Sequence, residues 1–200
     1  SNAKAALLGA LGHPSRGVRR NAIQVLPKTE ESTKRILSLN LLNDPDPQVR
    51  LAALLALCDL PPVSAAGPAL VNMWKQQALY QDRWIPDAFT AAAAANDSNF
   101  LQAVADFRSP DTGLLNTVKI VTGHYARGAN SKALPQLIAR LSDADPALAN
   151  AVIEGLGTGW PSDKLPILNQ QFEGNLKLLA ERLQPGDRGP LVKLAQNWGS

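Results

Sequence analysis

The stretch from Gly12 to Arg19 has the glycine spacing of a phosphate-binding loop. It reads Gly-His-Pro-Ser-Arg-Gly-Val-Arg, so valine stands where such a loop needs the lysine that contacts phosphate. A phosphate-binding loop also follows a β-strand, and the residues before Gly12 do not predict one. No nucleotide site is expected here.

A second glycine-rich stretch, from Gly155 to Gly159, resembles half of a dinucleotide-binding fingerprint. That fingerprint joins a strand to a helix, whereas these glycines follow a helical pattern. We therefore expect them to end a helix near residue 157 rather than to bind a cofactor.

Groups for nucleophilic or metal chemistry are few, because the chain has one cysteine, Cys58, and two histidines, His13 and His124. They form neither a zinc-binding set nor a Cys-His pair, and no Cys-x-x-Cys-His haem motif occurs. Cys58 ends an apolar run and is expected to be a buried, inert thiol. His13 stands in a loop position that aspartate occupies elsewhere, and His124 lies near a predicted helix end. The sequence thus predicts no catalytic residue, no metal, no cofactor and no small-molecule ligand.

Basic residues gather near the N-terminus. Residues 1–50 hold eight Lys or Arg against four Asp or Glu, and residues 51–100 hold two against four. Arg16, Arg19 and Arg20 form a local cluster, which is either a solvated terminal helix or a surface for a partner. Arg19 follows a valine early in its helix, and its guanidinium can reach a loop carboxylate such as Asp44, which would tie neighbouring repeats together.

The four tryptophans are candidates for packing or for ligand contacts. Trp84 starts a predicted helix, with Ile85 taken as the counterpart of Val49, and is expected to pack against the adjacent repeat. Trp74 belongs to a helix of mixed polarity and Trp160 to a Gly-Trp-Pro corner. Trp198, in the last helix, is the best candidate for exposure. The predicted partner surface therefore consists of Arg16, Arg19, Arg20 and Trp198.

An internal repeat must position these residues. His13-Pro-Ser-Arg-Gly-Val-Arg19 and Asp44-Pro-Asp-Pro-Gln-Val-Arg50 share one pattern 31 residues apart, and Asp143 opens a third copy 99 residues after the second. Asp46 is a helix-capping residue followed by proline at the first helical position, and Asp145 with Pro146 repeats that start. In the first copy Ser15 is expected to supply the cap.

Apolar residues after each cap recur with helical period. Around residues 49–60 they cover most sides of the predicted helix, which indicates neighbours on most sides. The predicted helices are 4–11, 15–26, 29–39, 46–59, 64–79, 83–95, 98–107, 113–126, 132–142, 146–157, 164–184 with a break, and 189–198. Self-similarity at this period predicts an all-α fold, an α-solenoid of five or six stacked helical pairs.

Length and composition agree with a folded domain. Ser1-Asn-Ala is typical of what remains after tag cleavage, and residues 4–200 are expected to form one repeat domain excised from a larger protein. The longest apolar run, residues 51–58, is too short to cross a bilayer, so no membrane insertion is expected.

The two helix starts and the Asp44-Pro-Asp-Pro loop resemble HEAT or PBS-lyase-type HEAT-like repeats, over about residues 12–160. Segments 13–27, 44–62 and 82–95 and the closing Leu-Ala-Gln-Asn-Trp-Gly resemble the helical part of large bacterial membrane-bound or secreted dehydrogenase-like proteins. That resemblance implies a propeller domain before the segment, a c-type cytochrome domain after it, and a periplasmic or other extracytoplasmic location.

Three functions are compatible with such a fold. The first is a non-catalytic scaffold that docks another protein or a neighbouring domain of the same chain. The second is nucleic-acid binding, as in HEAT-like DNA glycosylases, which a net charge of +3 supports only weakly. A phycobilin-lyase-type chaperone shares the fold, but no residue of this sequence argues for it. The sequence favours the scaffold.

Overall fold

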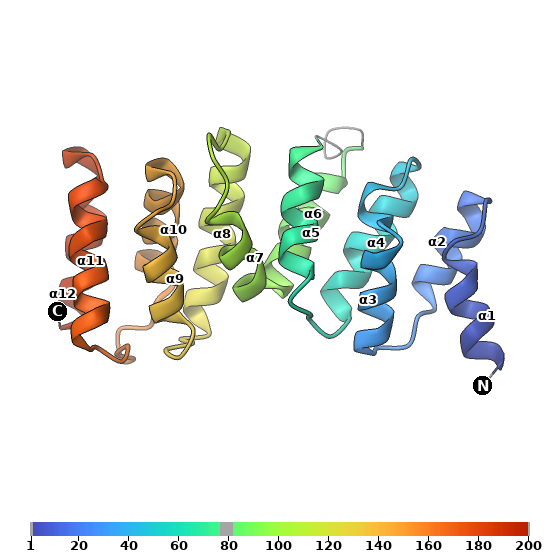
Figure 1. Cartoon of the computed structure of the whole chain (residues 1–200), viewed down its shortest axis with the longest axis horizontal. Coiled ribbons are helices and arrows are strands. Elements are labelled where there is room, and N and C mark those ends of the chain that lie inside the picture. Colours follow the sequence, from blue (N-terminus) through green and yellow to red (C-terminus); the bar gives the residue numbers. More distant parts are fainter. Residues whose placement is uncertain (1, 77–81, 200) are drawn as a thin grey trace. The chain divides into compact units, whose positions relative to one another are not determined.

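In the computed structural model, described for residues 2–76 and 82–199, the chain consists of α-helices joined by loops (Figure 1). The α-helices of the described residues are α1 (Asn2–Ala10), α2 (Arg16–Gln24), α3 (Glu30–Ser38), α4 (Pro47–Asp59), α5 (Ala66–Lys75), α6 (Ile85–Ala95), α7 (Asp97–Val104), α8 (Thr112–Arg127), α9 (Leu134–Leu141), α10 (Pro146–Gly159), α11 (Gln170–Arg182) and α12 (Arg188–Trp198). Short 3-10 helices are η1 (Leu41–Asn43) and η3 (Pro185–Asp187). The described part of the chain has no β-strand, and the predicted all-α fold is confirmed.

Most of the predicted helix ranges match the structure to within a few residues. The range 164–184 is too long, because residues 164–169 are not helical and α11 begins after Asn169. Pro166 disfavours a helix there, since it lacks the backbone N–H that a helix uses. The range 64–79 corresponds to α5, and its residues 77–79 lie outside the described residues.

Side chains at the N-cap positions explain where several helices begin. The Asp46 carboxylate accepts hydrogen bonds from the backbone N–H groups of Gln48 and Val49, at 3.0 and 3.2 Å. Asp145 accepts one from Ala147 N–H at 3.0 Å. Both capping predictions are therefore confirmed, and a proline follows each cap at the first helical position.

The chain divides into two compact units, residues 1–100 and 101–200, with the boundary inside α7. In the first unit, α2, α4 and α6 pack side by side in one layer, and α3 and α5 belong to the other layer (Figure 1). In the second unit, α8, α10 and α12 pack side by side, and α9 packs against α11. The prediction of a single domain stays a prediction.

Each unit has its own aromatic cluster in the core. In the first unit, the ring of Phe89 lies 5.3 Å from that of Trp74 and 6.0 Å from that of Phe100, measured between centroids. All three side chains are buried. Aromatic pairs at such distances add to the stability that burial alone provides. Trp74 is thus a core residue.

No helix within the described residues is long and apolar enough to cross a membrane.

Candidate docking face

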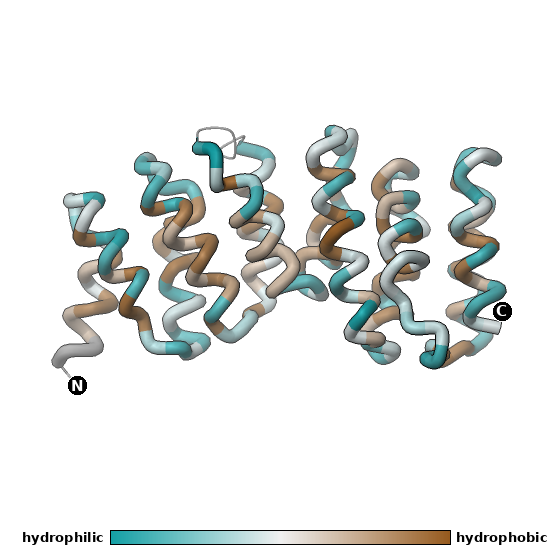
Figure 2. The backbone as a smooth tube through the Cα atoms, turned by 180° about the vertical axis from the view of Figure 1, so that it is seen from behind, coloured by the Kyte–Doolittle hydropathy of each residue, from teal (hydrophilic) through white to brown (hydrophobic). Residues whose placement is uncertain are grey.

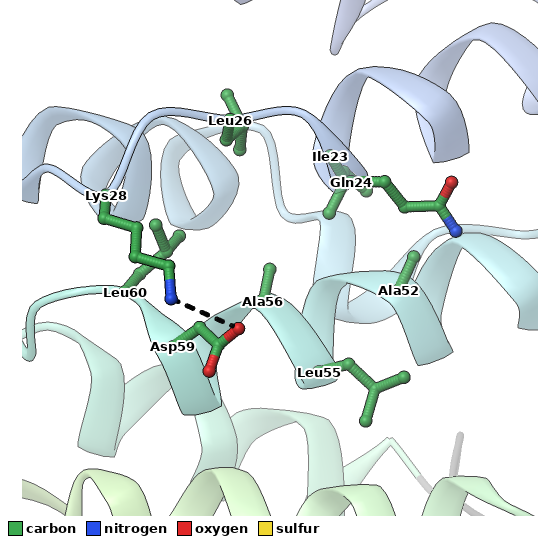
Figure 3. A pocket seen from close by; sticks show the side chains of 9 residues that line it. All are labelled: Ile23, Gln24, Leu26, Lys28, Ala52, Leu55, Ala56, Asp59 and Leu60. Carbon is green, nitrogen blue, oxygen red and sulfur yellow. Dashed lines mark ion pairs between the residues drawn. The ribbon is translucent and has the colours of Figure 1, made fainter.

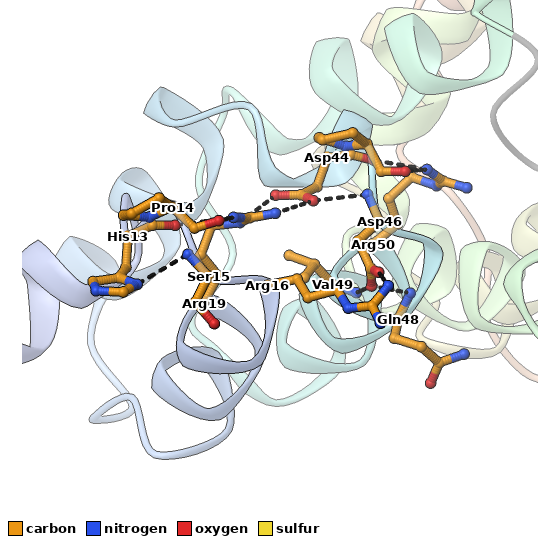
Figure 4. Close-up of polar contacts among 11 residues, drawn as sticks. His13, Pro14, Ser15, Arg16, Arg19, Asp44, Asp46, Gln48, Val49 and Arg50 are labelled. Carbon is orange, nitrogen blue, oxygen red and sulfur yellow. Dashed lines mark hydrogen bonds and ion pairs between the residues drawn. The ribbon is translucent and has the colours of Figure 1, made fainter.

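Three loops of the first unit share a local hydrogen bond at the start of the next helix, and Figure 4 shows the two loops that begin at His13 and Asp44. The Asp44 carboxylate accepts from the backbone N–H of Asp46 at 2.9 Å, and Asp82 accepts from Trp84 N–H at 2.8 Å. In the first copy, His13 Nδ1 accepts from Ser15 N–H at 3.0 Å. The interpretation of His13 as an aspartate-like loop residue is therefore confirmed.

Arg19 links the first repeat to the second through two short hydrogen bonds. Its Nε and Nη2 donate to the two carboxylate oxygens of Asp44, each at 2.7 Å, and its Nη1 donates to the carbonyl groups of His13 and Pro14. The Arg19 and Asp44 side chains are only 12% and 5% exposed. The hydrogen bonds from the guanidinium to Asp44 raise the pKa of Arg19 above its usual value. The predicted tie between repeats is confirmed, and this guanidinium is occupied within the chain.

The other copies keep parts of this arrangement. In the second copy, the buried Arg50 donates to the Asp44 carbonyl at 2.6 Å. In the third copy, Asp145 keeps the helix cap, but alanine at position 149 cannot supply the arginine contacts. Ser15 stands at the N-cap of α2 as predicted, but its side chain makes no capping hydrogen bond, so it occupies the position without supplying the expected cap.

Arg16 and Arg20 are the arginines of the predicted surface that remain exposed. Arg16 pairs with Asp46 at 3.2 Å, and its side chain is 78% exposed. No carboxylate of the described residues pairs with Arg20. Both arginines line a hollow of about 570 Å³ between the N-terminal ends of α2 and α4, together with Gln48.

Trp198 is buried, and the prediction that it is exposed is wrong. Its side chain is 1% exposed, and its ring packs 5.4 Å from Trp160 and 5.8 Å from Phe172. The Trp160 indole N–H donates to the Lys164 carbonyl at 2.7 Å within the same corner. Trp198 therefore serves the core of the second unit.

Trp84 lies beside the adjacent repeat, as predicted, but that packing leaves 56% of it exposed. It lines a groove of about 380 Å³ between α4 and α6, with Leu51, Leu55, Asp87, Ala88 and Ala91. The Arg83 guanidinium carbon lies 4.9 Å from the centre of the Trp84 ring. Trp84 also occupies the N-cap of α6, so Ile85 takes the helical position of Pro47 rather than that of Val49.

Leu55 is more exposed than the apolar pattern of its helix predicts. It is 53% exposed, although α4 was expected to have neighbours on most sides. Leu51 and Leu55 are four residues apart and so share one side of α4, away from the buried Val49 and Ala53. That spacing was the available signal for an apolar stripe facing away from the core.

A third hollow, of about 220 Å³, lies between the C-terminal ends of α2 and α4 (Figure 3). Lys28 and Asp59 form an ion pair across it at 3.6 Å, and Leu26 and Leu60 contribute apolar surface. Leu55 lines this hollow as well as the groove beside Trp84.

All three hollows lie along α4 in the layer of α2, α4 and α6, and two of them share Leu55. We call this surface the docking face, defined by Arg16 and Arg20 on α2, Leu51 and Leu55 on α4, and Trp84 and Ala91 beside and on α6. Figure 2 views the molecule from behind relative to Figure 1, and much of α4 carries hydrophobic colouring there. An exposed apolar centre with charged surroundings is typical of protein-interaction sites.

The layer of α8, α10 and α12 in the second unit also carries hollows. One of about 410 Å³, between α10 and α12, is lined by Lys119, Glu154 and Lys193 among others. Lys119 and Glu154 pair there at 2.7 Å. Ile120 is exposed in a second hollow of this layer, but neither hollow brings together two exposed large apolar side chains as the groove does with Leu55 and Trp84, so the first unit is the stronger candidate for docking.

The stretch from Gly155 to Gly159 forms the last five residues of α10, so it closes a helix as predicted, two residues beyond the expected end at 157. A Cβ atom on Gly155 would lie 2.6 Å from the Thr122 Cβ, and one on Gly159 would lie 2.4 Å from the Gly123 carbonyl oxygen. The absence of side chains at Gly155 and Gly159 lets α10 pack closely against α8.

The candidate chemical groups are dispersed. Cys58 is half-buried rather than buried, and its Sγ lies 3.5 Å from the Leu54 carbonyl oxygen. Burial raises the pKa of the Cys58 thiol, and the nearby Asp59 carboxylate adds to the rise. His124 is exposed in the last turn of α8. Across residues 2–76 and 82–199, no group of three or more His, Cys, Asp or Glu could hold a metal ion.

Comparison with known proteins supports the repeat. The HEAT repeat family model matches residues 39–60, which include η1, the Asp44 loop and α4. This match supports a HEAT-like repeat in that part of the chain. Neither a curated protein nor a solved structure matches the chain.

Proposed function

We propose that this chain is a non-catalytic helical-repeat scaffold whose docking face binds another protein or a neighbouring domain of the same polypeptide. The observation that carries the proposal is the groove between α4 and α6, where Leu55 and Trp84 are 53% and 56% exposed. Burying two such side chains against a partner removes apolar surface from water and favours association.

The family match supports the same conclusion. Residues 39–60 match the HEAT repeat, and HEAT repeats generally mediate protein interactions. The matched segment contains α4, which contributes the central stripe of the docking face. Arg16 and Arg20 border that stripe and belong to the proposed surface, whereas Arg19 and Trp198 serve the interior of the chain.

Nucleic-acid binding is the weaker candidate. Arg19 is neutralised by Asp44, and Arg16 is partly neutralised by Asp46. Of the three clustered arginines, Arg20 is therefore the one that keeps its full charge for a phosphate.

A finer version of the proposal places the scaffold in a bacterial oxidoreductase whose active and haem domains lie outside this chain. It rests on the sequence resemblance to dehydrogenase-like proteins. Reading the surrounding gene tests it: a Cys-x-x-Cys-His motif downstream and a propeller-type domain upstream are expected, and their absence would sink this version alone.

Site-specific photo-crosslinking in the cell that makes the protein tests the docking proposal. A benzophenone amino acid is placed at position 55 or 84, and as a control at 178, where leucine is also 53% exposed on a helix of the second unit. We expect positions 55 and 84 to give the same protein adduct, or the same crosslink to a neighbouring domain, and position 178 to give neither.

The partner protein or domain identified by the crosslink is then purified separately, and its binding to this chain is measured by calorimetry. The double variant Leu55→Gln with Trp84→Gln is expected to weaken binding by about tenfold or more, since anchors at an interface centre carry much of the affinity. Leu178→Gln is the matched control and should leave binding unchanged. Equal binding by the double variant and the wild type would refute the docking proposal.

A further inference from the structure

The hollow between α2 and α4 differs from the groove between α4 and α6 in charge. Arg16 and Arg20 line the first, and apolar side chains dominate the second. Asp46 is the carboxylate that lines the first hollow, and it already accepts two backbone hydrogen bonds and pairs with Arg16. Arg16 is therefore paired while Arg20 is not, and the hollow keeps an excess of positive charge.

The start of α2 adds to this excess. It carries no acidic residue in its first turn, and Ser15 provides no capping hydrogen bond. The first turn of a helix bears partial positive charge, which an acidic cap normally offsets, as Asp46 does for α4. A carboxylate brought to Arg16 and Arg20 would thus meet two guanidinium groups and an uncompensated helix end.

We infer that the partner presents a polypeptide segment with one large apolar side chain for the groove beside Trp84 and an Asp or Glu for Arg16 and Arg20. This inference rests on the proposed docking function and specifies the chemistry of the partner. The groove is large enough for one such side chain, and Asp87 at its edge disfavours a second carboxylate in it.

The spacing of the helices sets the distance between the two partner residues. Packed helices lie about 8–10 Å apart, so the groove and the hollow on either side of α4 are separated by about one such spacing. An extended chain advances about 3.3 Å per residue, which places the acidic residue about three positions from the apolar anchor.

Selection of a random peptide library on the purified chain tests this inference. We expect enriched peptides to pair Leu, Phe or Trp with Asp or Glu at a spacing of about three residues. An enriched peptide should lose about tenfold in affinity when its acidic residue becomes lysine, because attraction to the arginines becomes repulsion.

Two variants separate the inference from the proposed function. Arg16→Gln with Arg20→Gln should weaken peptide binding by roughly three- to tenfold, with the difference shrinking at high salt. Leu55→Gln with Trp84→Gln should weaken it by about tenfold or more, and Leu178→Gln should not change it. All the substituted side chains are exposed, and circular dichroism checks that each variant is folded.

The possible failures are distinguishable. Peptides that bind equally well to the arginine variant overturn the acidic-segment inference but leave the docking function standing. Peptides that also ignore the Leu55 and Trp84 changes contradict both. If no peptide is enriched, the inference fails, and the crosslinking experiment decides the docking function independently.

Discussion

At the scale of single residues, the repeated motif contains both buried residues that hold the repeats together and arginines that lie at the surface. Arg19 and Asp44 are nearly buried and saturated by hydrogen bonds, whereas Arg16 and Arg20 stand at the surface. A buried carboxylate that loses its partner stays desolvated, while an exposed one is solvated by water. Residues of one type in one cluster therefore have different roles.

Arg19→Ala is expected to lower the free energy of unfolding by about 3 kcal/mol, because it leaves Asp44 buried without its guanidinium partner. Chemical denaturation followed by circular dichroism measures the loss. Arg16→Ala is the matched control and should cost at most about 0.5 kcal/mol, since its ion pair is exposed. Equal losses for the two variants would contradict the structural role of Arg19.

Cys58 should react slowly with Ellman's reagent in the folded chain. Its raised pKa leaves less thiolate at a given pH, so the midpoint of the rate against pH should lie above that of the unfolded chain. Because the unfolded thiol ionises first as the pH rises, the folded state loses stability between the pKa of the unfolded thiol and the higher pKa of the folded one. A midpoint at or below the unfolded value would be inconsistent with the burial described.

At the scale of elements, small residues decide how closely α8 and α10 pack. Gly155 and Gly159 lie one helical turn apart and face α8, while Gly157 between them points into open space. Two of these glycines therefore allow a close helix contact, while the third, between them, makes none. A sequence pattern alone does not reveal which glycines face a neighbour.

Gly155→Ala should destabilise the protein by about 2 kcal/mol, because the added methyl group would overlap α8 and force the helices apart. Gly157→Ala is the control in the same helix, and it should raise stability by about 0.5–1 kcal/mol through better helix propensity. Thermal unfolding distinguishes the two. A neutral Gly155→Ala would mean that the two helices can separate without cost.

At the scale of the whole molecule, charge is largely balanced by internal pairs. The net charge is +3. In the basic N-terminal cluster, Asp44 of the next repeat neutralises most of the charge of Arg19, and Asp46 neutralises part of the charge of Arg16. The affinity for nucleic acid depends on the number of phosphates that the protein neutralises. With few free arginines, we expect weak binding and a shallow dependence of affinity on salt.

Binding to a labelled duplex DNA, followed by fluorescence anisotropy, should therefore be weaker than about 10 µM at roughly physiological salt. The logarithm of affinity should fall with the logarithm of salt with a slope of about −1 to −2. Tight binding with a slope near −5, reduced by Arg16→Gln and Arg20→Gln, would favour a nucleic-acid function instead.

Much of the fold was predictable because its signals are local. Asp46 with Pro47, and Asp145 with Pro146, start helices through hydrogen bonds within one turn, and the helical period of apolar residues marks the helices themselves. The ion pair between Arg19 and Asp44 was predictable because the motif that carries both residues repeats. A break was predicted within 164–184, but its position was not. A proline such as Pro166 stops a helix without marking where the next one begins, and α11 begins only at Gln170.

The sequence by itself determined the all-α class, the helix starts and the ties between the first repeats, because these depend on contacts within a turn or between copies of one motif. Only the tertiary structure decided which side chains are exposed. Trp198 is buried by Trp160 and Phe172, while Leu55 and Trp84 are left open beside α6. Exposure depends on which helices become neighbours, and that arrangement is a property of the packed layers rather than of any local pattern.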